Sequence, residues 1–243
     1  MTMDPLRRKS RSISLSTIGG KFSDGIAAIN STIEPRAEFW DNWNRESLTH
    51  KGPLWVTLGD SVTQGIGSSG PESSYVSIIL NRLRHRSCMD WRVVNLSMSG
   101  GRFADVTNHQ LPAMRDAGLK PDLVTAIIGS NDVMWRRHKG NISRDAREML
   151  NVLPIGTFLS KVSRSRKKGR RSLINSAFAE SAHDGKIQLF NSWNWPTGEG
   201  MWAEDHFHPN DHAYRYIANN LWFGLLDNYE FRAKWLTASG RKR

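Results

Sequence analysis

Short apolar runs alternate with amphipathic stretches over most of the chain, beginning near residue 52. The apolar runs predict five strands, over residues 54–58, 92–96, 123–128, 154–159 and 187–190. Apolar residues at helical spacing predict helices over 75–83, 105–117, 142–151, 172–183 and 211–226, with Pro112 interrupting the second. This alternation is typical of an α/β fold, in which an open parallel sheet is covered by helices on both faces.

The chain has 243 residues, which is enough for one domain with extensions. Residues 1–50 are predicted to be a partly disordered N-terminal extension, because residues 1–24 are rich in Ser, Gly and Arg. Within this extension, the aromatic residues of segment 25–50 indicate a helix that packs on the domain. Residues 52–225 form the predicted domain, and residues 226–243 the predicted basic C-terminal tail.

The formal net charge is +11, and its distribution matters more than its size. Residues 1–11 carry +3, residues 161–171 carry +7 and residues 241–243 carry +3, so the rest of the chain is close to neutral. Basic runs are most often solvated surface loops, and the most that residues 161–171 predict is weak contact with a polyanion or an anionic membrane surface. No aromatic residue is interleaved in this run, so we expect no specific nucleic-acid binding.

Cys88 is the only cysteine, which excludes an internal disulfide and is compatible with a reducing compartment. No stretch reaches the roughly 18 consecutive apolar residues that a transmembrane helix needs. The basic residues Arg7 and Arg8 are not followed by the apolar segment of a signal peptide. We therefore expect a cytoplasmic protein, with basic tails that leave room for peripheral membrane association.

Small and polar residues follow four of the predicted strands, the last group after a tryptophan-rich loop. They are Gly59-Asp60-Ser61 after the first, Ser99-Gly100-Gly101 after the second, Ser130-Asn131-Asp132 after the third, and Asp205-x-x-His208 beyond the fifth. The carboxyl ends of parallel strands meet at one edge of a sheet, where sites form in folds of this class. We therefore expect these residues to lie close together.

These residue types are the ones that acyl transfer requires. A serine hydroxyl needs an adjacent base, and a histidine can take its proton and return it to the leaving group. A carboxylate on the other ring nitrogen orients the histidine. Backbone N–H groups at glycines and an asparagine amide can stabilise the oxyanion of the tetrahedral intermediate.

In these four blocks, over about residues 52–225, the chain resembles the SGNH hydrolase family, also called GDSL lipases or esterases. The resemblance implies a three-layer α/β/α sandwich with a five-stranded parallel sheet, similar to flavodoxin, and an enzyme without cofactor or metal. It also implies Ser61 as nucleophile, His208 as general base, Asp205 as the residue that orients it, and Ser61, Gly100 and Asn131 as oxyanion donors.

Two other interpretations of the glycines and the serine fit less well. Gly65, Gly67 and Gly70 have the spacing of a dinucleotide fingerprint, but they do not follow the strand directly. They are predicted to form a flexible loop beside the site. Residues 59–63 lack the G-x-S-x-G elbow of the α/β-hydrolases, which argues against that fold.

A metal site is also disfavoured. His206, His208 and His212 lie close in the sequence, but zinc needs three or four ligands in one shell and usually a better-defined spacing. Only His208 is predicted to be functional.

The predicted function is hydrolysis of a small-molecule acyl ester through an acyl-enzyme on Ser61. Val62 and Ser130 depart from the family pattern without removing a catalytic atom, so they bear on substrate choice. The tryptophan-rich segment 191–202 is predicted to border the acyl or alcohol pocket. Two alternatives stay open: transfer of the acyl group to an alcohol or amine at the same site, and a non-enzymatic protein that binds a polyanion or a membrane surface.

Overall fold

The computed structural model describes residues 23–134, 142–162, 168–196 and 200–236. Three predicted segments lie wholly or partly outside the described residues. They are residues 1–22 of the N-terminal segment 1–24, the central part of the basic run (163–167) and the end of the C-terminal tail (237–243).

Five parallel strands form one sheet in the order β2-β1-β3-β4-β5. They are β1 (Leu54–Gly59), β2 (Arg92–Asn95), β3 (Leu123–Ile127), β4 (Thr157–Ser160) and β5 (Ile187–Phe190). The predicted α/β class and five-stranded parallel sheet are confirmed. The fourth strand begins later than predicted, because Pro154 belongs to a turn in which its carbonyl accepts hydrogen bonds from the backbone and side chain of Thr157.

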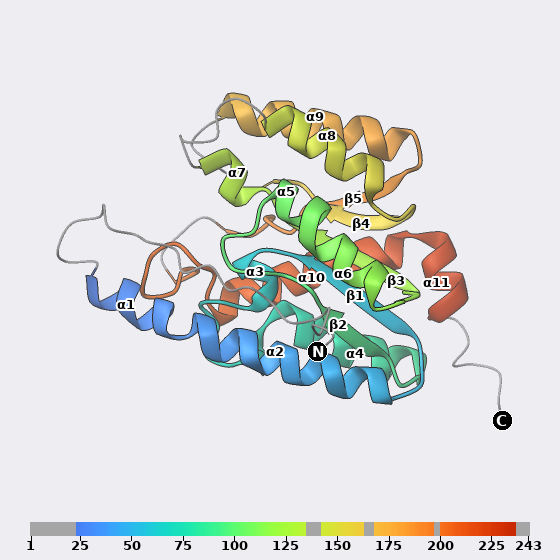
Figure 1. Ribbon diagram of the computed structural model, residues 1–243, viewed down its shortest axis with the longest axis horizontal. Helices are drawn as coiled ribbons and strands as arrows, with labels where there is room; N and C mark the ends of the chain where they lie inside the picture. Colours follow the sequence, from blue (N-terminus) through green and yellow to red (C-terminus); the bar gives the residue numbers. More distant parts are fainter. Residues whose placement is uncertain (1–22, 135–141, 163–167, 197–199, 237–243) are drawn as a thin grey trace.

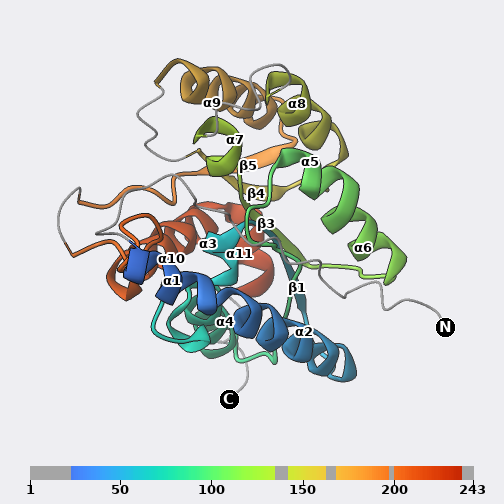
Figure 2. The ribbon, with the colours of Figure 1, turned by 60° about the vertical axis from the view of Figure 1, so that its left-hand side comes forward.

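Helices cover both faces of the sheet, as the two views in Figures 1 and 2 show. Side chains of β1 alternate between the two faces: Leu54, Val56 and Leu58 join the hydrophobic core on one face, whereas Trp55 joins the core on the other. The strands thus supply both cores of a three-layer sandwich.

The helix bounds follow the predicted pattern with some differences. They are α3 (Ser61–Gln64), α4 (Tyr75–Ser87), α5 (Phe103–Asp105), α6 (Leu111–Asp116), α7 (Ser130–Met134), α8 (Ile142–Val152), α9 (Lys168–His183) and α10 (Asp211–Asp227), with a 3₁₀ turn at Pro71–Ser73. The predicted helix 105–117 is three successive pieces: α5, a π-helical turn (Val106–Gln110) and α6. Pro112 lies in the first turn of α6, where a missing N–H is tolerated.

Segments before and after the predicted domain also pack on the sheet. The helix expected in 25–50 is divided into α1 (Ser23–Ser31) and α2 (Ile33–Thr49), and α2 lies alongside the edge strand β2. Part of the expected C-terminal tail is the helix α11 (Tyr229–Trp235), whose Phe231 is buried. Among the described residues, no helix has both the length and the apolar character that crossing a membrane requires.

Candidate active site

Ser61 is the first residue of a one-turn helix directly behind β1. Asp60 caps this helix, because its Oδ1 accepts a hydrogen bond from the backbone N–H of Val62 at 3.0 Å. The first N–H groups of any helix have no partner within the helix, so this turn aims backbone donors at the space before it. Ser61 itself is only 3% exposed.

His208 reaches Ser61 from a loop 147 residues further along the chain. The Nε2 atom of His208 lies 3.0 Å from the Oγ of Ser61, and its Nδ1 lies 2.5 Å from the Oδ2 of Asp205. The other carboxylate oxygen of Asp205 accepts hydrogen bonds from the backbone N–H groups of Phe207 and His208. The three side chains therefore form one continuous line of hydrogen bonds.

The charge of Asp205 decides which ring nitrogen carries the proton. Burial by itself would raise the pKa of Asp205, but the hydrogen bonds and charge of His208 and two backbone N–H groups hold the pKa below its ordinary value. An ionised carboxylate only accepts hydrogen bonds, so Nδ1 of His208 is the donor. Nε2 is then free to accept the hydroxyl proton of Ser61.

The loop after β2 and the helix after β3 lie against each other beside β1. The Nδ2 of Asn131 donates to the backbone carbonyl of Gly101 at 2.9 Å. The same loop is tied to the end of β1, since the N–H of Met98 donates to the carbonyl of Gly59 at 3.2 Å. The structure thus brings Asn131 into contact with the loop that contains Gly100.

Two buried carboxyl groups near the site were not singled out by the sequence. Burial raises the pKa of both Asp60 and Asp132 to about 7. Backbone N–H groups oppose this rise at both residues: Val62 donates to Asp60, and Phe103 donates to Asp132. Their position beside Ser61 and Asn131 in the sequence was the available signal.

Gln110 is another site residue that sequence reasoning missed. Its side-chain amide accepts from the N–H of Gly59 and donates to the carbonyl of Gly59, each at 2.8 Å. Both residues are buried, and Gln110 ends the π-helical turn. No local pattern in the sequence connects a glutamine to a strand end 51 residues earlier, so the contact is visible only in the structure.

The glycine-rich segment 65–70, which is predicted to be a flexible loop, makes hydrogen bonds with two helices. Arg36 donates to the hydroxyl and the carbonyl of Ser68, and Tyr214 donates to the carbonyl of Ile66. Ser69 donates from its backbone N–H and its hydroxyl to Asp211. Hydrogen bonds from α2 and to α10 therefore fix this segment against the loop that carries His208.

The tryptophan-rich segment forms an aromatic cluster next to that loop. The rings of Trp193 and Trp195 are 4.9 Å apart, and those of Trp195 and Trp202 are 6.3 Å apart. Trp202 is 41% exposed and forms a backbone bridge with Pro209, the residue after His208. That this cluster borders the acyl or alcohol pocket remains a prediction.

The two other histidines beside His208 in the sequence lie on the surface. His206 and His212 are exposed, and within the described ranges no three potential metal ligands are grouped so that they could hold an ion. Within the described parts of the basic run 161–171, Lys161 and Lys168 are also exposed.

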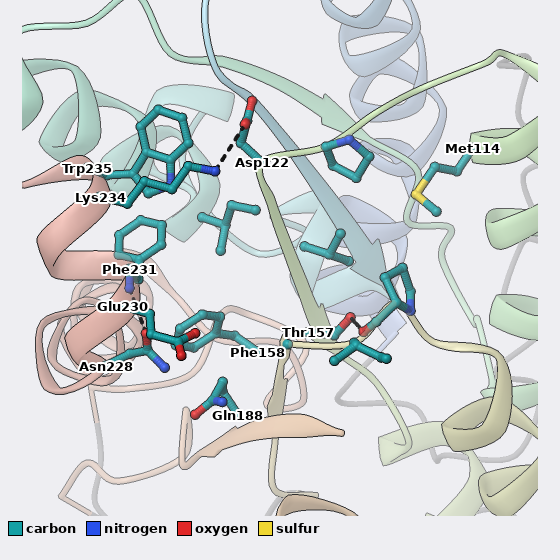
Figure 3. Close-up of a pocket in the computed structure, with 16 residues that line it drawn as sticks. Met114, Asp122, Thr157, Phe158, Gln188, Asn228, Glu230, Phe231, Lys234 and Trp235 are labelled. Carbon is teal, nitrogen blue, oxygen red and sulfur yellow. Dashed lines mark hydrogen bonds and ion pairs between the residues drawn. The ribbon is translucent and has the colours of Figure 1, made fainter. Parts of the chain in front are cut away.

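A separate pocket of about 370 Å³ lies at the amino ends of the strands, opposite the end where Ser61 lies. Figure 3 shows it between the amino ends of β3 and β4 and the helix α11, with Phe231 and Trp235 on one side. Asp122 and Lys234 approach to 3.9 Å across its rim. None of the candidate catalytic residues lines it.

Comparisons with known proteins identify a matching family and solved structures with a similar fold. Residues 57–216 match the model of the GDSL-like Lipase/Acylhydrolase family. The solved structure of TesA is similar at 24% sequence identity and a TM-score of 0.60, over 71% of this chain and 97% of that chain. The psychrotrophic esterase EstA from Pseudoalteromonas sp. has 16% identity and a TM-score of 0.57, over 72% of this chain and 99% of that chain.

Axe2, an acetylxylan esterase from Geobacillus stearothermophilus, is similar at 17% identity and a TM-score of 0.57, over 72% of this chain and 94% of that chain. No curated protein sequence matches the chain. At these identities the solved structures establish a shared fold.

Proposed function

The chain belongs to the GDSL-like lipase/acylhydrolase family, and we propose that it cleaves a small-molecule acyl ester through an acyl-enzyme on Ser61. Membership of this family makes it an ester-hydrolysing enzyme. The hydrogen-bonded line from Ser61 through His208 to Asp205 is the observation that supports the proposed mechanism.

The first half of the reaction forms the acyl-enzyme. Oγ of Ser61 attacks the carbonyl carbon of the ester while Nε2 of His208 takes the hydroxyl proton. Asp205 stabilises the imidazolium that results. The N–H groups of Ser61 and Gly100 and the amide of Asn131 hold the oxyanion, and His208 then protonates the departing alcohol.

The second half releases the acid. His208 takes a proton from water, which attacks the acyl carbon, and the proton returns to Oγ of Ser61 as the carbon–oxygen bond breaks. If an alcohol or amine replaces water in this step, the product is a transferred acyl group. The same side chains serve both reactions, so the products formed with an added alcohol separate hydrolysis from transfer.

Labelling with a fluorophosphonate tests the proposal, because this probe forms a covalent bond only with an activated serine. We expect the wild-type protein to be labelled at Ser61 by peptide mass, and Ser61→Ala to remain unlabelled. His208→Ala should slow labelling and hydrolysis of p-nitrophenyl acetate by about a thousandfold or more.

His212→Ala is the matched control, since His212 is an exposed histidine four residues further on. It should be labelled at the wild-type rate. A folded wild-type protein that takes no label would overturn the proposal. Salt-sensitive binding to anionic vesicles that persists in Ser61→Ala would then favour the non-enzymatic alternative.

A further inference from the structure

The buried face of α2 carries polar groups beside apolar residues such as Ile33 and Ala37. Arg36, Trp40 and Asn44 are four residues apart, which places them on one side of the helix, and their exposed fractions are 5%, 1% and 0%. A helix that covers a domain ordinarily buries an apolar stripe. Buried polar groups need hydrogen-bond partners, so the polar atoms of Arg36, Trp40 and Asn44 indicate specific contacts beneath α2.

Each of these three side chains bonds either to the last residue of a strand or to the segment beyond a strand of the sheet. Nε1 of Trp40 donates to the carbonyl of Gln64 at 2.9 Å. Asn44 bonds to both backbone groups of Asn95: its Nδ2 donates to the carbonyl at 2.9 Å, and its Oδ1 accepts from the N–H at 2.8 Å. Arg36 holds Ser68 at 3.1 and 3.2 Å.

The residues to which α2 bonds also connect α3 to the loop 96–102, which contains Gly100 and is called the oxyanion loop below. Nδ2 of Asn95 donates to the carbonyl of Thr63, and Oδ1 of Asn95 accepts from the N–H and hydroxyl of Ser97. The hydroxyl of Ser99 donates to Oε1 of Gln64 at 2.5 Å. Asn95 and Gln64 therefore join α3 and the oxyanion loop into one buried network.

The length of α3 explains why this network matters. A helix of one turn is not stable by itself, and its last carbonyl groups have no partner within the helix. The carbonyls of Thr63 and Gln64 accept instead from Asn95 and Trp40. The orientation of Ser61 at the start of α3 thus depends on side chains outside that helix.

We propose that Arg36, Trp40 and Asn44 are positioning residues of the active site, through which α2 sets Ser61 and the oxyanion loop in their reactive arrangement. This inference rests on the proposed function. All three residues precede the segment 57–216 that matches the family model, so the family motifs do not account for them.

Replacement of Trp40 by phenylalanine tests the inference, because it removes the indole donor and keeps an aromatic ring. A small displacement of catalytic groups costs rate rather than binding, and we expect kcat for p-nitrophenyl acetate to fall about tenfold with KM unchanged within about twofold. The rate constant for fluorophosphonate labelling of Ser61 should fall by a similar factor.

Trp55→Phe is the matched control. Trp55 is equally buried, and its Nε1 donates to the hydroxyl of Thr125 at 3.0 Å, near the amino end of β1. Both variants lose one buried indole hydrogen bond, so both should lower the melting temperature. Only Trp40→Phe should lower kcat.

The outcomes separate the two proposals. If the wild-type protein is labelled and Trp40→Phe keeps the kcat of Trp55→Phe, α2 has only a structural role and the inference is wrong. If the wild-type protein takes no label, the proposed function fails and this inference with it. If Trp40→Phe does not fold, the test passes to Arg36→Lys. This variant keeps the charge but cannot donate to both the hydroxyl and the carbonyl of Ser68, and it must show the same loss of kcat.

Discussion

At the scale of single residues, the site combines carboxyl groups with opposite environments. Asp205 receives hydrogen bonds from His208 and two backbone N–H groups, which lower its pKa. Asp60, one residue before Ser61, is buried with fewer donors, and burial raises its pKa to about 7. Asp205 is therefore ionised at neutral pH, whereas Asp60 exchanges its proton there.

Asp60 should make the stability of the protein depend on pH. Between about pH 4 and pH 7 the folded protein keeps a proton on Asp60 that the unfolded chain releases, so this contribution to stability is lost as the pH rises through about 7. Asp60→Asn stays neutral and keeps an oxygen for the N–H of Val62. From pH 5 to pH 8, the free energy of unfolding of the wild type should fall by about 2 kcal/mol relative to that of Asp60→Asn. Urea unfolding at both pH values measures this difference, and a difference that does not change with pH would contradict it.

At the scale of elements, the segment 65–70 joins the two halves of the site. It follows the helix that begins with Ser61, and hydrogen bonds link it to Arg36 on α2 and to Tyr214 on α10. Gly67 lies directly against the loop with His208. A displacement of this segment should therefore reach the loop with His208 as well as the helix α3, which begins with Ser61.

Gly67→Ala should disturb the site through this contact. A Cβ at Gly67 would lie 2.5 Å from the carbonyl oxygen of Pro209 and 2.8 Å from the Cβ of His208, at a φ of +92°. We expect a loss of about 1–3 kcal/mol in stability and at least a tenfold loss in kcat. Gly118→Ala is the control, because its φ is +63° and nothing lies within 4 Å of an added Cβ. It should lose stability but keep kcat, and equal kcat values for the two variants would refute the coupling.

At the scale of the whole molecule, the carboxyl and amino ends of the parallel strands differ in what they contribute. Ser61 and Asn131 follow the carboxyl ends of β1 and β3, whereas α11 packs near the amino ends of β3 and β4 (Figure 3). The ring of Phe231 on α11 lies 6.1 Å from that of Trp91 and 6.0 Å from that of Phe158. Side chains at this end contribute to the core without touching the candidate catalytic residues.

Phe231→Ala should separate stability from activity. Phe231 is 7% exposed, and its truncation leaves a cavity beside two aromatic rings, so the free energy of unfolding should fall by about 3 kcal/mol. Phe223→Ala removes an aromatic ring that is 59% exposed and should cost about 0.5 kcal/mol or less. Urea unfolding gives both values. The kcat of both folded variants should equal that of the wild type, and a loss in Phe231→Ala would show that the two ends are coupled.

The sequence by itself determined the fold class and indicated which residues form the candidate site. Periodicity along the chain distinguishes strands from helices, because each side chain's face follows from local backbone geometry. The blocks that contain Ser61, Gly100, Asn131 and His208 were recognisable because each directly follows a strand or has a short internal spacing. Such signals involve neighbours in the chain and need no knowledge of how distant segments pack.

Only the tertiary structure decided which distant groups meet. Three kinds of contact join residues that are far apart in the chain. They are the 3.0 Å contact between Ser61 and His208, the hydrogen bonds of Gln110 with Gly59, and those of the buried side chains of α2. A hydrogen bond depends on a few tenths of an ångström and on direction, which the packing of whole elements sets. For the same reason the hydrogen bonds of the glycine-rich segment could not be predicted, because its partners on α2 and α10 lie far from it in the chain.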